Sequence, residues 1–291
     1  MREGSSLLLT VKLNTRDHDK ESRRHSLIDR YPQNWNMTTN LRSQWQANAR
    51  AYSKLIAEKG TPHHREILNP CIERLMGDVL GKYILDAGCG EGYLSRLYAQ
   101  KGAKVTGVDF SPSLISESKQ RSQNFDITYL VGDICQLEDI QANQFDIVLC
   151  NLVLLNVNCL ESSLQEFHRV LRSGGFLIFS VVHPAFNVYG PGQWELGEKD
   201  PTTGRRKGQY FKTDNYHTEK EFQIRWNSRT GEGFPKKFSF FHRTISTYVN
   251  TVIESGFQLV AFEEPLPSTD APFFERERRV PFFLVIKAEK S

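Results

Sequence analysis

The chain has 291 residues, enough for one large domain or two small ones, and its 39% hydrophobic and 24% charged residues are typical of soluble globular proteins. A formal net charge of +3 is too small to indicate a dedicated nucleic-acid-binding face. No apolar run approaches the roughly 20 residues of a membrane-spanning helix, and the early SLLLTV is too short for a signal-peptide core, so we expect a cytoplasmic protein without a membrane partner.

The first 80 residues divide into a polar extension and a helical pair. Residues 1–40 are charged and weakly patterned, which favours a flexible extension. After Leu41, the residues Trp45, Ala49 and Tyr52 follow at three- and four-residue spacing and share one helical face. A second helix is expected over residues 67–76. Together these helices predict a lid over residues 41–80.

Residues 81–183 alternate short apolar strands with helices. The predicted strands read KYILDAG, AKVTGVDF, DITYLVGD, QFDIVLCNLVLL and FLIFSVV. The helix after the second strand has Ser111 as its expected N-cap and Pro112 at its first position. Apolar strands alternating with helices indicate a parallel sheet covered on both faces, so the predicted fold class is α/β, doubly wound.

Residues 184–242 interrupt this alternation. They are rich in aromatic, charged and glycine residues and show no helical period. The segment far exceeds an ordinary loop of roughly 2 to 6 residues, so we expect it to cover a substrate. Residues 243–291 return to the core with the helix TISTYVNTVIESGF and the strands QLVAFEEP and VPFFLVIKA. The long connection between these strands suits an antiparallel last pair.

The glycines Gly88, Gly90 and Gly92 follow the first predicted strand in the order G-x-G-x-G. A dinucleotide-binding turn needs G-x-G-x-x-G, and Tyr93 occupies the position of its third glycine. The lysine motif of a phosphate loop is also absent from the sequence. The spacing therefore disfavours both phosphate-binding interpretations and indicates a backbone that approaches some other ligand closely.

Polar side chains end the next three strands. Asp109 closes the second strand, where a carboxylate can accept hydrogen bonds from ribose hydroxyls, although it could also serve only the following helix. Asp133 closes the third strand and Asn151 the fourth. Because the carboxyl ends of parallel strands meet at one edge of the sheet, we expect one ligand site there.

The cysteine pattern argues against both a disulfide framework and a metal site. The number is odd, and no Cys-x-x-Cys pair is present. We expect five reduced, mostly buried thiols: Cys71, Cys89, Cys135, Cys150 and Cys159.

The motifs LDAGCGEG, VTGVDFSPSLI, VGDICQL, FDIVLCNLVL and HRVLRSGGFLIFSVVHP together resemble class I S-adenosylmethionine-dependent methyltransferases, and among these the bacterial small-molecule enzymes. The resemblance is closest over residues 82–183. It implies a Rossmann-like sheet of seven strands, mostly parallel with an antiparallel last strand. It also implies S-adenosylmethionine as cofactor and S-adenosylhomocysteine as product.

The same resemblance implies where the cofactor binds. Asp109 would hold the ribose hydroxyls, Asp133 the adenine amino group, and Asn151 would lie beside the sulfonium. Tyr52 would cover the cofactor from the lid, unless it is an ordinary core tyrosine. The complete implied set is Tyr52, Asp86, Gly88, Cys89, Gly90, Gly92, Asp109, Phe110, Asp133, Ile134, Asn151 and Leu152.

One departure bears on the acceptor. Enzymes that methylate exocyclic amines of DNA commonly carry two prolines after the fourth strand, whereas this chain reads Asn151-Leu152-Val153-Leu154. We therefore expect no DNA partner. The aromatic residues of the insertion favour a small acceptor with apolar or aromatic surface.

Two histidines flank the insertion and are candidate catalytic residues. His183 follows the fifth strand in VVHP, and His242 is expected to open the last long helix in FHRT. Either could act as an acid or base toward the acceptor, or could be a hydrogen-bonded structural residue.

The sequence thus favours in-line methyl transfer to an oxygen or nitrogen of a small molecule, of which a secondary metabolite is one option. An RNA acceptor is the alternative. A non-catalytic cofactor-binding protein is a further alternative, because fold alone does not fix function. A dinucleotide oxidoreductase is the least favoured.

Overall fold

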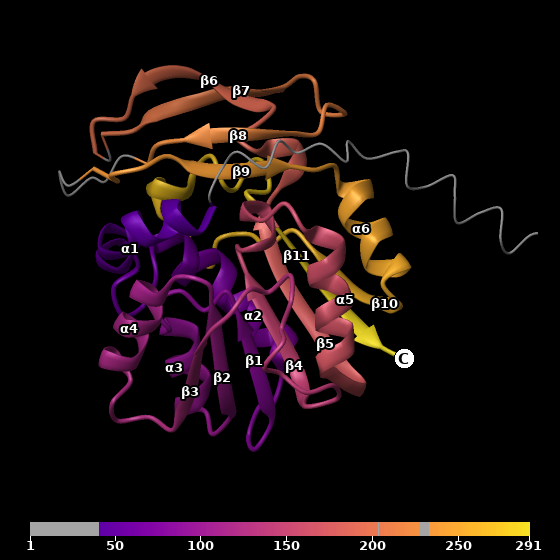
Figure 1. Ribbon diagram of the computed structural model, residues 1–291. Coiled ribbons are helices and arrows are strands. Elements are labelled where there is room, and N and C mark those ends of the chain that lie inside the picture. Colours follow the sequence, from indigo (N-terminus) through magenta and orange to yellow (C-terminus); the bar gives the residue numbers. More distant parts are fainter. Residues whose placement is uncertain (1–40, 203, 227–232) are drawn as a thin grey trace, which may run out of the picture. The chain divides into compact units, whose positions relative to one another are not determined.

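Seven strands form one sheet in the part of the chain that the computed structural model describes, residues 41–202, 204–226 and 233–291 (Figure 1). The predicted extension over residues 1–40 lies outside these ranges. The strand order is β10-β11-β5-β4-β1-β2-β3. The bounds are β1 Tyr83–Ala87, β2 Lys104–Asp109, β3 Ile127–Val131, β4 Phe145–Asn151, β5 Leu171–Val182, β10 Phe257–Glu263 and β11 Phe283–Lys290.

The direction of the strands follows the prediction. Strands β1 to β5 pair in parallel, and β11 pairs antiparallel with both of its neighbours, β5 and β10. The doubly wound α/β fold with an antiparallel last strand is therefore confirmed.

Helices cover both faces of the sheet because its central strands are apolar on both sides. In β1, Ile84 packs into one hydrophobic cluster and Leu85 into the other. The first cluster is covered by α2 (Asn69–Met76) and α3 (Tyr93–Gln100), and the second by α5 (Leu160–Val170) and α6 (Ile245–Glu254). Alternation of side chains along each strand produces the two faces.

Helix α4 (Pro112–Arg121) begins as the sequence predicts. The Ser111 hydroxyl accepts a hydrogen bond from the Leu114 amide at 3.4 Å, and Pro112 occupies the first helical position. The helix packs against β3 and α1. This contact sets the loop after β2 beside the N-terminal helix.

The predicted lid over residues 41–80 serves two different purposes. Helix α1 (Leu41–Ile56) lies over the carboxyl end of the sheet, and its side chains Trp45 and Tyr52 reach the cavity described below. The π-helical turn His64–Leu68 leads into α2, which packs on β5 and β11 as part of the core. Of the two helices, α1 is therefore the one that reaches the cavity, and the lid over residues 41–80 stays a prediction. Within the described ranges, no helix combines the length and apolar character needed to cross a membrane.

The insertion contains two β-hairpins, which were not predicted from the sequence. Strand β6 (Gly192–Lys199) pairs with β7 (Arg206–Thr213), and β8 (Lys220–Ile224) pairs with β9 (Phe238–His242). Figure 1 shows both hairpins lying across one end of the sheet. The Asn156 amide donates to the Ser239 carbonyl at 2.8 Å, which ties β9 to the loop after β4.

The prediction that His242 opens the last long helix is wrong. His242 is the final residue of β9, and α6 begins at Ile245. The Thr244 hydroxyl accepts a hydrogen bond from the Thr247 amide at 3.1 Å and caps the helix. A threonine cap with an extended backbone therefore separates the histidine from the helix.

Candidate cofactor site

A cavity lies at the carboxyl ends of β1 to β4, under α1. Nine of the twelve residues predicted to bind the cofactor line it: Tyr52, Gly88, Gly90, Asp109, Phe110, Asp133, Ile134, Asn151 and Leu152. The loops after four successive strands thus meet in one place, as expected at this edge of a parallel sheet.

The cavity is also lined by six residues that were not predicted as site residues from the sequence: Trp45, Leu114, Gly132, Val153, Asn156 and Val157. Trp45 shares its helical face with Tyr52, so the same spacing could have indicated it. Gly132 and Val153 directly follow or precede predicted site residues. The remaining three carry no signal of their own in the sequence.

Gly88 is required because the loop passes against Val153. Its φ is +76°, and an added Cβ would overlap Val153 Cγ2 and lie 2.7 Å from Cγ1. At Gly90, with φ of +56°, an added Cβ would lie 3.3 Å from the Tyr52 ring. The backbone of the loop therefore forms a wall of the cavity, with little room for side chains.

Three predicted cofactor residues lie away from the cavity lining. Gly92 has φ of +83°, and an added Cβ would overlap the Tyr129 hydroxyl and lie 3.0 Å from Ser118 Cβ. Its role in the fold is close packing of the loop against β3 and α4. Cys89 packs into a small buried cluster with Tyr129. Asp86 is buried, and its carboxylate accepts a 2.6 Å hydrogen bond from the Ser95 hydroxyl.

Asp109 links the glycine-rich loop to the start of α4. One carboxylate oxygen accepts from the Gly90 amide at 3.0 Å, and the other accepts from the Ser111 amide at 2.9 Å. Burial raises the pKa of Asp109 to about 6, while these two hydrogen bonds act in the opposite direction. Each oxygen keeps lone-pair capacity for a further donor, which suits two ribose hydroxyls.

The strand β4 ends in a strained turn at the cavity. Leu152 has φ of +56°, a left-handed conformation that costs a residue with a side chain about 1 kcal/mol or more. Its amide donates to the Ser180 carbonyl at 3.1 Å, and the Ser180 hydroxyl donates to Asn151 Oδ1 at 2.6 Å. Neighbouring β5 thus holds the turn in place and fixes Asn151 at the edge of the cavity.

Aromatic rings from α1 cover one side of the cavity. The Trp45 ring centroid lies 5.2 Å from that of Tyr52 and 4.7 Å from that of Phe238. Tyr52 also stacks on Trp226, with 6.3 Å between centroids. Burial, and then the neighbouring Glu91 carboxylate, raise the pKa of the Tyr52 phenol, which therefore stays protonated.

With these rings in place the cavity volume is about 60 Å³. Small-molecule sites usually measure roughly 300 to 1,000 Å³. The side chains of α1 therefore narrow this cavity, and Trp45 and Tyr52 are the rings that border it from that helix. The donor and acceptor set fits a nucleoside-sized cofactor: a close backbone, paired carboxylate oxygens and an exposed Asp133.

The two candidate catalytic histidines are buried and lie outside the cavity lining. His183 Nε2 lies 2.8 Å from Glu264 Oε1, and its Nδ1 accepts from the Ala185 amide at 3.2 Å. His242 Nε2 lies 2.8 Å from the Tyr216 carbonyl oxygen. Its Nδ1 is buried without a hydrogen-bond partner among the described residues. Burial lowers the pKa of both rings and favours their neutral forms.

The expectation of five reduced cysteines is wrong for two of them. Cys135 and Cys159 form a disulfide, with Cα atoms 5.9 Å apart, whereas Cys71, Cys89 and Cys150 are free and buried. The pair joins the loop after β3 to the start of α5, segments 24 residues apart, and no local spacing reveals that proximity. Asp133 lies near both sulfurs, but sulfurs bonded to each other are not the thiolates that zinc requires.

Reduction of this disulfide is expected to lower the free energy of unfolding by about 3 kcal/mol, because the bond closes a loop of intermediate length in the unfolded chain. Chemical denaturation with and without dithiothreitol measures the change. A Cys135→Ser/Cys159→Ser variant is the control and should not respond to the reductant. Equal stability of the wild type under both conditions would show that the bond contributes nothing.

Comparisons with known proteins agree with this geometry. Residues 85–179 match the family model of a methyltransferase domain. An uncharacterized protein of Haemophilus influenzae is 29% identical over 237 residues, which cover 77% of this chain and 87% of that protein. A malonyl-[acyl-carrier protein] O-methyltransferase of Hamiltonella defensa is 33% identical over 132 residues, or 45% of this chain. The match spans half the length of that relative.

A solved structure is also similar. The S-adenosylmethionine-dependent methyltransferase of Mesorhizobium loti superposes with a TM-score of 0.61 and is 27% identical. The match covers 76% of this chain and 96% of that one.

Proposed function

The chain belongs to the class I S-adenosylmethionine-dependent methyltransferase superfamily, and from that premise we propose that it methylates an oxygen or nitrogen of a small-molecule acceptor. The observation that carries the proposal is the single cavity in which the glycine-rich loop, Asp109, Asp133 and Asn151 meet. Its cofactor is S-adenosylmethionine, whose sulfonium supplies a methyl group already activated for in-line displacement.

The main task of the chain is placement. Holding a nucleophile in line with the methyl group can supply roughly 7 to 11 kcal/mol of the activation barrier. In this proposal Asp109 and Gly90 hold the ribose end, Asp133 and Ile134 the adenine, and Asn151 and the turn at Leu152 border the transfer position. The same loops exclude water when α1 covers them.

The lining of the cavity supports a small acceptor with an apolar surface. Trp45 and Tyr52 line the cavity, and the fully buried Phe238 and the half-buried Trp226 pack against them. Such rings supply contact area, whereas Asn156 and the Tyr52 hydroxyl supply the few polar groups that orient a ligand. The named relative is an O-methyltransferase, which favours an oxygen acceptor.

The catalytic roles of His183 and His242 remain predictions. The unpartnered His242 Nδ1 is the observation that favours His242, because a neutral ring nitrogen can accept a proton from a hydroxyl. A His242→Ala variant should lose turnover and keep its affinity for S-adenosylhomocysteine. Wild-type turnover in that variant would show that His242 has only a structural role in β9.

Replacement of Asp109 with alanine is expected to weaken S-adenosylhomocysteine binding by about 1.5 to 3 kcal/mol, because the carboxylate that faces the ribose position is lost. Isothermal titration calorimetry measures the change. Asp139→Ala, at an exposed acid outside the cavity lining, is the control. Unchanged affinity in the Asp109 variant would contradict the ribose assignment.

The acceptor is identified by label transfer. The protein is incubated with S-adenosylmethionine carrying a deuterated methyl group and a cell extract, and the extract is separated into RNA, protein and small molecules for mass spectrometry. Label in one small molecule supports the proposal. Label in RNA would favour the alternative acceptor, and cofactor binding without any label transfer would favour a non-catalytic protein.

A further inference from the structure

We propose that a second cavity, bordered by α1, α3 and the end of α4, binds an organic phosphate. This basic cleft has a volume of about 1,060 Å³ and shares no lining residue with the cofactor cavity. Five basic side chains line it, namely Lys54, Lys59, Arg65, Arg96 and Arg121. The inference goes beyond methyl transfer and does not depend on the identity of the acceptor.

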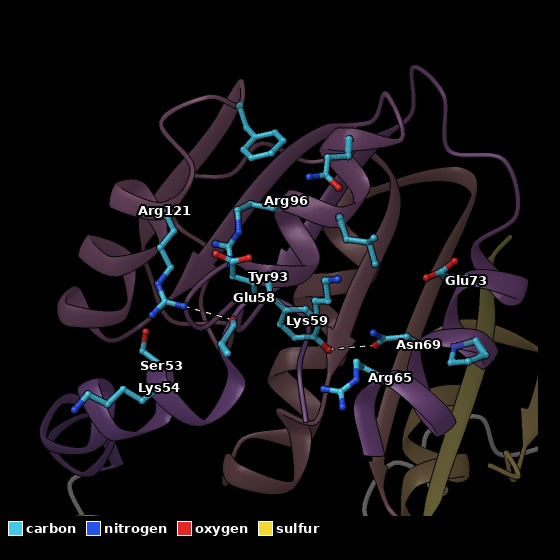
Figure 2. Close-up of a pocket in the computed structure, with 15 residues that line it drawn as sticks. Ser53, Lys54, Glu58, Lys59, Arg65, Asn69, Glu73, Tyr93, Arg96 and Arg121 are labelled. Carbon is cyan, nitrogen blue, oxygen red and sulfur yellow. Dashed lines mark hydrogen bonds between the residues drawn. The ribbon is translucent and has the colours of Figure 1, made fainter. Parts of the chain in front are cut away.

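The basic side chains come from different elements and converge on one opening. Lys59 follows α1, Arg65 lies in the π-helical turn, Arg96 is on α3 and Arg121 ends α4. Figure 2 shows Arg121, Arg96 and Arg65 spread around the cleft, with Lys59 between them. Segments far apart in the sequence therefore bring cations together, which a solvated helix face would not do.

Few acids in the cleft offset this charge. The two acidic side chains in its lining are Glu58 and Glu73. Glu73 is already paired with Lys101, whose Nζ lies 2.7 Å from its Oε2. Five cations against Glu58, Glu73 and the Glu91 carboxylate beneath two of the arginines leave a formal charge of +2 around the cleft. A ligand with at least two negative charges complements this excess.

At the floor of the cleft, the buried Arg96 and the half-buried Arg121 share one buried carboxylate. Arg96 is 8% exposed and Glu91 is 1% exposed. Arg96 Nη2 donates to Glu91 Oε2 at 2.8 Å, and Arg121 Nη1 donates to the same oxygen at 3.2 Å. Within the described residues, the hydrogen bonds of Arg96 use two of its five N–H groups, both toward Glu91. The remaining donors suit a second anion.

The chemistry of the lining favours phosphate attached to an organic group. Guanidinium groups bind phosphate oxygens in a bidentate manner, and three arginines line the cleft. The volume is that of an organic ligand, far above what one inorganic ion needs. Leu97, Phe125 and Pro70 supply apolar contact for the remainder of such a ligand.

Glu91 connects the cleft to the cofactor site. It stands between Gly90, which lines the cofactor cavity, and Gly92. On α1, Tyr52 lines the cofactor cavity, and the next residue, Ser53, lines the cleft. An anion that draws Arg96 and Arg121 away from Glu91 releases the loop that positions Gly90 against Asp109. Ligand in the cleft therefore weakens cofactor binding, and by linkage the cofactor weakens ligand binding.

The test uses the full chain and two probes, inorganic pyrophosphate and fructose 1,6-bisphosphate, neither of which carries a purine for the cofactor cavity. Binding is measured by calorimetry at constant ionic strength, with sodium sulfate as the comparison anion. The variant is Lys59→Gln/Arg65→Gln. The matched control is Arg50→Gln/Lys237→Gln, which removes the same charges at exposed positions outside the cleft.

We expect at least one probe to bind, the cleft variant to lose at least tenfold in affinity, and the control to keep its affinity. The saturating probe should raise the dissociation constant of S-adenosylhomocysteine at least threefold in the wild type and in the control. Absence of binding by both probes, or equal loss in both variants, would overturn the cleft as a phosphate site. An unchanged dissociation constant would overturn its link to the cofactor.

The same titrations separate this inference from the proposed function. The cleft variant without probe should bind S-adenosylhomocysteine as the wild type does, because no cleft residue lines the cofactor cavity. Loss of that binding would make the cleft part of the cofactor site and would contradict the inference, while methyl transfer would stand. Failure of the wild type to bind S-adenosylhomocysteine would contradict the proposed function alone.

Discussion

Replacing Gly88 with alanine is expected to destabilise the fold by about 4 kcal/mol and to abolish measurable binding of S-adenosylhomocysteine. A left-handed backbone costs a residue with a Cβ roughly 1 to 2 kcal/mol. Here the Cβ would also overlap the Val153 side chain, and overpacking of this kind costs about 1 to 3 kcal/mol. Since Val153 lines the cofactor cavity, its displacement reshapes the site itself.

A second glycine separates the two contributions. Gly174 has φ of +72° and no atom within 4 Å of the position of an added Cβ. Gly174→Ala should therefore show the backbone cost alone, and Gly88→Ala/Val153→Ala should regain the part that overpacking causes. Chemical denaturation gives the stabilities. If Gly88→Ala and Gly174→Ala cost the same, the contact with Val153 plays no part.

The meeting of the candidate site residues at one cavity could be predicted because its signals are local. Each strand that delivers a site residue is a short apolar run, and each site residue follows directly at its carboxyl end, as Asp109 and Asn151 do. Parallel pairing then brings these ends together without further information from the sequence. Tyr52 was placed near the loop by the family resemblance and not by its position in the sheet.

Features that depend on pairing between distant segments could not be predicted. Helix α5 ends at Val170, ahead of the glycine pair at 174 and 175, because Leu171 pairs with Phe145 of β4. The strands of the insertion lack a regular polar and apolar alternation: β9 is buried along its whole length, whereas β7 is mostly exposed. The disulfide and the basic cleft likewise join segments that lie apart in the sequence.

Buried acids surround the glycine-rich loop that we propose as part of the cofactor site. Asp86, Glu91 and Asp109 are all at most 7% exposed and all act on the Tyr52 hydroxyl. Burial of carboxylates costs stability unless they are paired or protonated. The cofactor carries a positively charged sulfonium, so the ionised acids favour its binding. The site thus combines a cost to the unliganded fold with attraction for a cation.

This cost predicts a pH-dependent stability that an Asp86→Asn variant should remove. Burial, the largest cause, raises the pKa of Asp86 from 3.8 to about 7. An acid whose folded pKa is raised stabilises the fold fully below its unfolded pKa, and this contribution is lost as pH rises through the folded pKa. At 1.36 kcal/mol per pKa unit the shift corresponds to roughly 4 kcal/mol.

The measurement is chemical denaturation without cofactor at about pH 4 and about pH 8. Wild type and Asp86→Asn should have similar stability at the lower pH, and the variant should be the more stable by up to roughly 4 kcal/mol at the higher pH. Asparagine can still accept the Ser95 hydrogen bond, which keeps the comparison close to a change of charge alone. Asp139→Asn, at an exposed position, should follow the wild type. Parallel pH profiles of wild type and Asp86→Asn would mean that folding leaves the pKa of Asp86 unshifted, and the electrostatic attraction for the cofactor would then come without a cost in stability.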